Sequence, residues 1–374
     1  MSNYMNMEKA PYPFEVVGSF LRPDKLKKAR EKFSKGEIKK KDLTAVENEA
    51  VRELVMKEKE AGLPAVTDGE FRRRYWHLDF FAALEGVAEI GAEHWSVEFQ
   101  GEQPKPATVK ITGKIGFGRH PFLEDFKFMK SVAGNTVVKQ TIPSPSMLHL
   151  MCCVREENYK PLERYREEDV LFADIAAAYQ DAVQAFYAAG CRYLQFDDTS
   201  WGEFCDLSKR EAYAERGLDL DVTAQKYVDM LNRILEVKPD DMVITMHVCR
   251  GNFRSTWFSS GGYEPVAEIL FGGCHVDGFF LEYDSDRAGD FAPLRFIRNQ
   301  KVVLGLVTSK DPKLECEQEI VEKICKAQQY VPLKQLCISP QCGFSSTEEG
   351  NLLTEEEQWR KVELVKSIAE KVWS

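Results

Sequence analysis

Short apolar runs alternate with longer amphipathic stretches along most of the chain. The runs are bounded by Gly, Pro or charged residues, as buried strands are. The stretches between them place apolar residues three and four positions apart, which is typical of helices with one buried face. The clearest of these stretches covers residues 167–190, and Gly190 would cap its end. The chain is therefore predicted to consist of repeated βα units.

Eight of the apolar runs are interpreted as strands. Eight strands that alternate with helices predict an α/β fold, a (β/α)8 TIM barrel, built as a single domain over residues 1–374. A doubly wound parallel sheet would show the same alternation and stays open as an alternative. The barrel is favoured because polar residues close six different strands, and a barrel brings all its strand ends to one mouth. The predicted strands cover residues 13–19, 63–68, 136–145, 191–198, 241–249, 276–284, 301–309 and 336–341.

Residues 72–135 interrupt the alternation of predicted strands and helices. They contain two stretches with alternating polar and apolar positions, WSVEFQ at 95–100 and ATVKITGKI at 107–115, around a link rich in Gly and Pro. Alternation with a period of two residues indicates strands with one buried face. A β-hairpin insertion after the second strand is therefore predicted, as a β-rich lobe within the barrel domain.

Composition limits the kind of protein and of partner. With 44% hydrophobic and 29% charged residues, the chain is an ordinary globular protein able to fill a large core. It has no apolar run near the ~20 residues that cross a bilayer, and its start lacks the features of a signal peptide, so a cytoplasmic location is expected. The formal charge of −10 argues against nucleic acid or an anionic membrane as partner. Small-molecule substrates are expected, and a homo-oligomer stays possible.

One apolar run closes on His247 and Cys249 in the sequence MHVC. Residues two apart on a strand point to the same face, so the imidazole and the thiol would project side by side. Two later runs close in the same way, on Glu282 in GFFLEYD and on Cys342 in PQCGF. A buried carboxylate is costly unless it is paired, protonated or bound to a metal. Because zinc favours four N, S or O ligands in a tetrahedral array, these four side chains are predicted to form a Zn2+ site.

Two further strands close on Glu70 and Asp197. Carboxylates that meet at one mouth repel each other unless a cation lies between them, and the ammonium group of a substrate would serve. The alternative is that one of them pairs with an arginine of residues 72–74. The turn at Gly18 and Ser19 could offer backbone N–H groups and a hydroxyl to a substrate carboxylate. These two carboxylates and this turn are the candidate substrate ligands.

Six short segments in this order and spacing resemble the catalytic barrel of the cobalamin-independent methionine synthase family: VVGSF, DGEF, LQFDD, MHVC, FLEYD and PQCGF. The resemblance spans residues 14–374. It implies that the four metal candidates hold zinc and act in catalysis, and that the four substrate candidates bind homocysteine. A thiol bound to zinc ionises and becomes a nucleophile. The expected activity is that of a methyltransferase in methionine biosynthesis, with the substrate sulfur displacing water or Glu282 from the metal.

The methyl donor stays open. Full-length members of the family carry a second, N-terminal half that helps to bind polyglutamylated folate, and we expect this chain to have no room for it. A methyltetrahydrofolate is the expected donor, with a corrinoid carrier or a sulfonium compound as alternatives. The segment after Asp198 reads TSW, whereas the family more usually has D-E-P at this strand end, so this wall of the pocket is expected to differ.

Three other functions compete with this one. A related enzyme could alkylate another thiol such as coenzyme M, but its sulfonate would need cations where the mouth offers Glu70 and Asp197. The zinc could be purely structural in a non-catalytic barrel, in which case its ligand shell would be closed. A metal-free decarboxylase of the related barrel type would hold no zinc at all.

Overall fold

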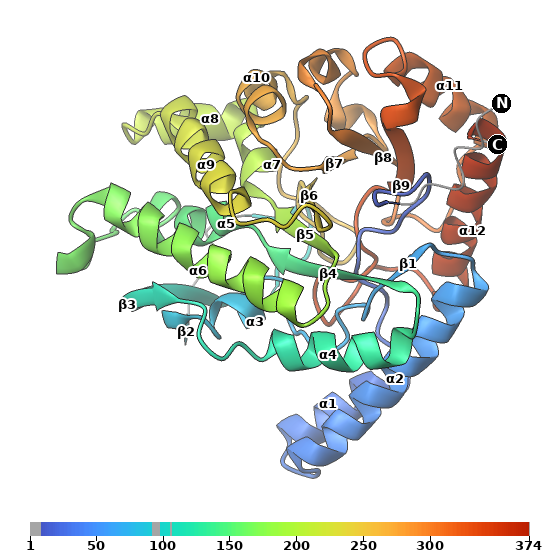
Figure 1. Ribbon diagram of the computed structural model, residues 1–374, viewed down its shortest axis with the longest axis horizontal. Coiled ribbons are helices and arrows are strands. Elements are labelled where there is room, and N and C mark those ends of the chain that lie inside the picture. The colour runs from blue at the N-terminus through green and yellow to red at the C-terminus, as the bar shows by residue number, and fades with distance from the viewer. Residues whose placement is uncertain (1–8, 92–97, 105–106, 374) are drawn as a thin grey trace.

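A curled, seven-stranded parallel sheet forms the centre of the molecule (Figure 1). The computed structural model describes residues 9–91, 98–104 and 107–373. The strand order is β1-β4-β5-β6-β7-β8-β9, and every neighbouring pair is parallel. The bounds are β1 (Ala65–Val66), β4 (Val137–Pro143), β5 (Tyr193–Asp198), β6 (Val243–Val248), β7 (Gly278–Glu282), β8 (Lys301–Val307) and β9 (Leu336–Pro340). Seven of the eight predicted strands are therefore present in the predicted order.

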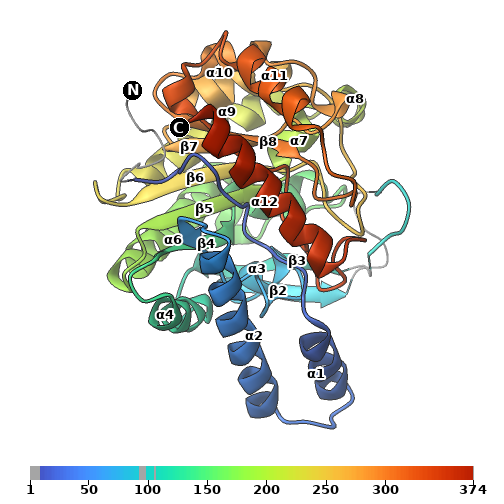
Figure 2. The same ribbon diagram turned by 90° about the vertical axis from the view of Figure 1, so that its right-hand side faces the viewer.

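Helices connect the successive strands and cover the outer face of the sheet (Figure 1). Each long helix buries one stripe of apolar residues, which is why the sequence shows a helical period. The long helices are α1 (Asp24–Ser34), α2 (Lys40–Glu60), α4 (Phe122–Ala133), α6 (Glu168–Ala188), α9 (Leu220–Leu235), α10 (Glu264–Gly273), α11 (Glu317–Ala327) and α12 (Glu355–Val372). The shorter ones are α3 (Leu78–Phe81), α5 (Pro145–His149), α7 (Ser200–Phe204) and α8 (Leu207–Glu215). Figure 2 shows α1 and α2 packed as a hairpin that projects from the body.

The N-terminal run that was predicted as the first strand is no regular strand. It makes only two isolated parallel bridges, Phe14 with Ile338 of β9 and Ser19 with Gly69 beyond β1. The physical reason is that β1 has only two residues and that Pro13 lacks an N–H, so few ladder hydrogen bonds are available. The segment nevertheless lies between the two edge strands of the curled sheet. Closure into an eight-stranded barrel stays a prediction.

A separate two-stranded antiparallel sheet stands between β1 and β4 in the chain. It pairs β2 (Glu85–Gly91) with β3 (Ala107–Gly116), and β3 alternates buried and exposed positions as its sequence indicated. Of the predicted strand at 95–100, residues 95–97 lie outside the described residues and residues 98–100 are not in a strand. The partner of β3 is the earlier run EGVAEIG. The single domain over 1–374 and the lobe over 72–135 stay predictions.

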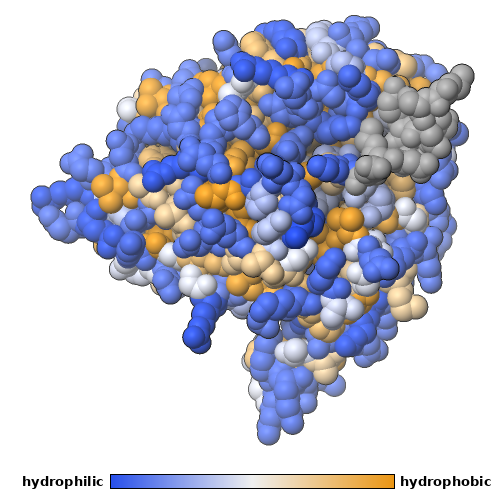
Figure 3. Space-filling model, viewed as in Figure 1, coloured by the Kyte–Doolittle hydropathy of each residue, from blue (hydrophilic) through white to orange (hydrophobic). Residues whose placement is uncertain are grey.

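The surface matches the composition. The face seen in Figure 3 is mainly hydrophilic with scattered apolar residues, as expected for a globular chain with a large buried core. Among the described residues, no helix is both long and apolar enough to span a membrane.

Candidate active site

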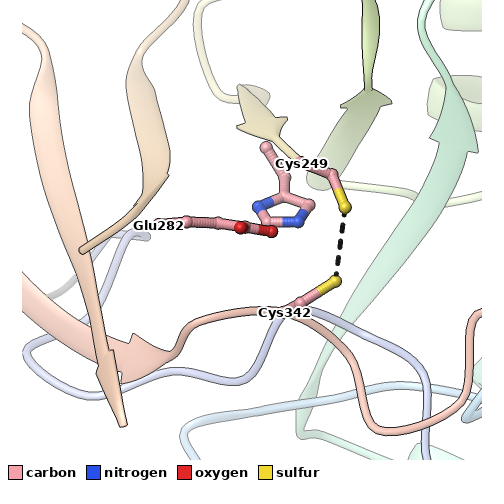
Figure 4. Close-up of side chains that lie close together, drawn as sticks. Cys249, Glu282 and Cys342 are labelled. Carbon is pink, nitrogen blue, oxygen red and sulfur yellow. Dashed lines mark hydrogen bonds between the residues drawn. The ribbon is translucent and has the colours of Figure 1, made fainter. Parts of the chain in front are cut away.

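Four side chains from three strand ends meet at the carboxyl edge of the sheet. His247 and Cys249 come from the end of β6, Glu282 closes β7, and Cys342 follows β9. One ligand atom from each lies within 4.8 Å of every other, and all four residues are buried. Figure 4 shows Cys249, Glu282 and Cys342 pointing toward one another from three separate segments of the chain. The structure therefore brings together all four side chains that were singled out as metal candidates.

Local hydrogen bonds explain why these positions converge. The backbone N–H of Cys249 donates to the Asp198 carbonyl (2.7 Å), which extends the β5 and β6 pairing beyond the end of the strand. The N–H of Gln341 donates to the Val307 carbonyl (2.7 Å), which places Cys342 directly after it. Close approach at the first point needs Gly202, because a Cβ there would lie 2.1 Å from the Cys249 carbonyl oxygen.

The thiols of Cys249 and Cys342 lie in hydrogen-bond contact with each other. Their sulfur atoms lie 3.6 Å apart. The hydrogen bond from Cys249, together with the nearby His247 ring, holds the pKa of Cys342 well below its ordinary value. The same hydrogen bond, with burial, raises the pKa of Cys249 well above its ordinary value. Cys342 therefore ionises more readily than Cys249.

His247 and Glu282 are the other two donors. Both ring nitrogens of His247 are buried, and neither has a hydrogen-bond partner of good geometry among the described residues. Burial disfavours its imidazolium form, but the contact with Cys342 and the charges of Asp197 and Glu282 outweigh burial and raise its pKa. Burial also raises the pKa of Glu282, against the charge of Arg287, which lies 3.5 Å from its Oε2. Two thiols, an imidazole and a carboxylate with unpaired buried atoms are a donor set that fits Zn2+.

A pocket opens over this cluster, with about 760 Å³ of free space including its mouth. Its inner part is polar and includes Ser19, Glu70 and Asp197. Its outer wall is largely aromatic, made by Tyr75, Trp76, His77, Phe99, Phe253 and Phe258. Of the four cluster residues, only Glu282 does not line the pocket, and it is fully buried behind the others. A ligand in the pocket would therefore meet the sulfur and imidazole side of the cluster.

Glu70 pairs with an arginine, as the alternative interpretation of the sequence allowed. Arg73 Nη1 lies 3.3 Å from Glu70 Oε1, and the Thr141 hydroxyl donates to the same oxygen at 2.8 Å. The other oxygen, Oε2, is buried and has no hydrogen-bond partner among the described residues. Burial is the largest influence and raises the pKa of Glu70 despite Arg73. One carboxylate oxygen is thus held by the protein and one is left over.

Asp197 is arranged in the same way. Gln195 stands two residues earlier on β5 and donates from Nε2 to Asp197 Oδ1 at 2.7 Å and to the Val17 carbonyl at 2.9 Å. Within the described part of the chain, Oδ2 accepts no hydrogen bond. Burial raises the pKa of Asp197 to about 7, with a further contribution from the charge of Glu70 and an opposing one from His247. The two carboxylates therefore present one free oxygen each to the inner pocket.

Ser19 lines the pocket, whereas Gly18 lies behind it. The Gly18 carbonyl accepts a hydrogen bond from the Thr67 hydroxyl (2.7 Å). Ser19 accepts from the Ser345 N–H at its Oγ (3.2 Å), and its carbonyl accepts from the Phe344 N–H (3.0 Å). These bonds join the turn to the loop that carries Cys342. A substrate group held by Ser19 would thus lie beside the metal candidates.

Three residues in or beside the pocket were not predicted to act in the site. Gln195 could have been found, because it lies two positions from Asp197 on the same strand face. Lys310 follows the seventh predicted strand in the sequence TSKDP and closes it in the same manner as the other candidates. Arg155 gives no such signal, since it follows a π-helical turn (Leu150–Val154) and reaches the pocket through the fold alone.

Comparison with known sequences gives a family match over nearly the whole chain. The family described as cobalamin-independent synthase, catalytic domain, matches residues 12–362. The uncharacterized protein YxjH of Bacillus subtilis is 47% identical over 368 residues, which cover 98% of this chain and 96% of that protein. The methionine synthase of Sulfolobus acidocaldarius is 25% identical over 343 residues, 91% of this chain and 88% of that protein.

Two solved structures extend the comparison. One is a Listeria monocytogenes protein, provisionally described as a vitamin-B12 independent methionine synthase. It is 44% identical to this chain and has a TM-score of 0.80, and the match covers 98% of this chain and 100% of that one. A B12-independent methionine synthase from Shewanella sp. W3-18-1, solved in complex with selenomethionine, has a TM-score of 0.73 at 19% identity, over 96% of this chain and 97% of that one. The second likeness establishes a shared fold.

Proposed function

Since the chain belongs to the family of cobalamin-independent synthase catalytic domains, we propose that it is a zinc-dependent methyltransferase that converts homocysteine to methionine. The observation that carries the proposal is the cluster of His247, Cys249, Glu282 and Cys342. Its ligand atoms all lie within 4.8 Å of one another, and all of these residues except Glu282 line a pocket. When bound there, Zn2+ would favour the thiolate form of a substrate thiol, which is the nucleophile for methyl transfer.

The remaining inner residues suit the amino-acid part of homocysteine. Glu70 and Asp197 each offer one oxygen without a hydrogen-bond partner in the described part of the chain, and an ammonium group between them would relieve their mutual repulsion. Ser19, with the backbone of its turn, is the candidate partner for the substrate carboxylate. Selenomethionine, which the Shewanella protein binds, is an analogue of the product methionine and agrees with an amino-acid ligand in this pocket.

The outer wall suits the methyl donor. Trp76 and His77 lie with ring centroids 4.6 Å apart, and Phe99 packs edge-on against Phe258 at 5.3 Å. Such a wall excludes water from the reacting groups and offers flat faces to an aromatic donor. A methyltetrahydrofolate is therefore the donor that we propose.

A structural role for the metal is less well supported. A structural zinc site is closed on all sides by protein, whereas His247, Cys249 and Cys342 line an open pocket. Transfer to a sulfonate-bearing thiol such as coenzyme M is also less well supported, because Glu70 and Asp197 would repel the sulfonate.

The proposal is tested by product formation. Zinc-loaded protein, metal-stripped protein and metal-stripped protein with zinc restored are each supplied with homocysteine and 5-methyltetrahydrofolate, and methionine is measured. We expect methionine only in the first and third samples. Equal turnover without zinc would contradict the metal's role, and no turnover in any sample would contradict the substrate assignment.

A further inference from the structure

Lys310 links the loops that carry the two cysteines of the cluster. It lies just beyond β8, and its ammonium donates to the Gly251 carbonyl (3.2 Å) and to Asn252 Oδ1 (2.7 Å). Gly251 stands two residues after Cys249. One side chain from the β8 loop therefore fixes the backbone immediately beyond the first cysteine.

Asn252 extends this link to the second cysteine. Its Nδ2 donates to the Gly343 carbonyl (2.7 Å) and to the Ser346 hydroxyl (3.0 Å). Gly343 is the residue directly after Cys342. A continuous series of hydrogen bonds thus runs from Lys310 through Asn252 to the loop of Cys342, and it joins the loops after β6, β8 and β9.

The residue before Lys310 strengthens the same connection. The Ser309 N–H donates to Gln341 Oε1 (2.9 Å), and the Ser309 hydroxyl donates to the Gly343 carbonyl (3.0 Å). The β8 loop is therefore held against the loop of Cys342 at two points as well as through Asn252. The backbone beside Lys310 is thus already fixed, so only its side chain has to be ordered for the ammonium to bind Gly251 and Asn252.

The charge of Lys310 suits the cluster beside it. Cys249, Glu282 and Cys342 become anions when they bind a divalent metal. Their three negative charges exceed the two positive charges of the metal, so the site as a whole is negative. The ammonium of Lys310 binds Gly251 and Asn252 and therefore lies beside the loop that follows Cys249. Arg287, another cation near the cluster, already contacts Asp284 at 3.2 Å as well as Glu282.

We propose that Lys310 is a positioning residue for the metal site: through Asn252 it sets the separation of Cys249 and Cys342, and its charge balances the anionic ligands. The inference rests on the proposed function, because it assumes that the cluster holds zinc. Partners outside the first ligand shell commonly set metal affinity by about 10–100-fold, and Lys310 has the geometry and the charge for this role.

The test is the zinc dissociation constant, measured by competition with a chromophoric chelator. We expect K310M to weaken zinc binding by about 10–100-fold, and K310R, which keeps the charge, to recover most of the affinity. K313M is the matched control: Lys313 is an exposed lysine three residues away, and its removal should leave zinc binding unchanged. The thermal midpoint of each metal-free variant shows whether its fold is intact.

A double-mutant cycle separates the link through Asn252 from a general effect of charge. If Lys310 acts through Asn252, N252A also weakens zinc binding, and the double variant K310M/N252A loses less than the sum of the two single losses. Wild-type affinity in K310M would overturn the inference and leave the metal site standing. Failure of the wild-type protein itself to bind zinc would overturn the proposed function, so the two failures are distinguishable.

Discussion

The sulfur atoms of Cys249 and Cys342 lie 3.6 Å apart although 93 positions separate the two residues in the chain. The β6 loop supplies one and the β9 loop the other, and no local segment holds them together. Parallel strands that end at one edge of a curled sheet bring such distant residues to one place. Their closeness is therefore a property of the whole fold, and it identifies the point on which the proposed chemistry depends.

Loss of either thiol should abolish the metal site. We expect C249S and C342S each to lose bound zinc, because a serine hydroxyl does not ionise to replace a thiolate ligand. Zinc content of the purified variants, measured by elemental analysis, checks this expectation. C316S is the control, since Cys316 is exposed and far from the cluster in the chain. Full zinc content in C342S would count against the assigned ligands.

Asp197 should determine affinity for the amino group of the substrate. In D197N a neutral amide replaces the carboxylate that lines the pocket, and a hydrogen bond to a charged partner is worth about 1.5–3 kcal/mol. We expect the KM for homocysteine to rise by about 10–100-fold, while zinc content stays at the wild-type level. An unchanged KM would show that the ammonium group does not bind at Asp197.

Gly343 should be needed for the contact between the Cys342 loop and Ser19. A Cβ at position 343 would lie only 2.0 Å from Ser19 Oγ, so one of the two must shift. We expect G343A to lower the free energy of unfolding by about 1–3 kcal/mol and to raise the KM for homocysteine. G272A is the matched control, because a Cβ at Gly272 would meet nothing within 4 Å. Equal effects of the two substitutions would contradict the close approach.

His120, which does not line the pocket, should make the stability of the protein depend on pH. Its Nδ1 accepts the Phe122 N–H (3.3 Å), so Nε2 carries the proton and donates to the Phe80 carbonyl (3.0 Å). Burial lowers the pKa of His120 to about 4, from about 6.5 in the unfolded chain. Since the unfolded state takes up this proton first, the stabilisation is present above pH ~6.5 and is lost as the pH falls toward ~4, by about 1.4 kcal/mol per pH unit.

Urea unfolding of wild-type protein and H120Q at several pH values between ~7 and ~5 measures this contribution. Glutamine offers one donor and one acceptor but does not titrate in this range. We expect the free energy of unfolding to fall more steeply with falling pH in the wild-type protein than in H120Q. The stability advantage of the wild-type protein should therefore shrink. Parallel curves would show that His120 protonates equally in both states.

Most of the sheet could be predicted because strands that are buried on both faces appear in the sequence as continuous apolar runs. β5 to β9 are apolar runs that close on polar residues, and the helices between them show a helical period with one buried face. The first run failed as a strand because its neighbour β1 has only two residues and because its own Pro13 lacks an N–H. The pattern of apolar positions reveals neither feature. The partner of β3 was missed because two alternating stretches precede β3, residues 85–91 and 95–100, and nothing local selects between them.

The site likewise contains residues that the sequence could predict and residues that it could not. His247, Cys249, Glu282 and Cys342 could be selected together because each closes a predicted strand, and strand ends meet in a parallel fold. Arg155 reaches the pocket from a helical turn without any strand signal. The pairing of Glu70 with Arg73 was only one of two options, since a sequence does not show whether an arginine three residues away turns toward a carboxylate or toward solvent.

The most direct test of the account is the zinc coordination shell seen by X-ray absorption, with and without homocysteine. Before homocysteine is added, we predict a shell with two sulfur ligands from Cys249 and Cys342, completed by nitrogen and oxygen. After addition, we predict a third sulfur at about 2.3 Å in place of an oxygen ligand. A shell that does not change on addition, or a protein that binds no zinc, would contradict the claim that this cluster activates a substrate thiol.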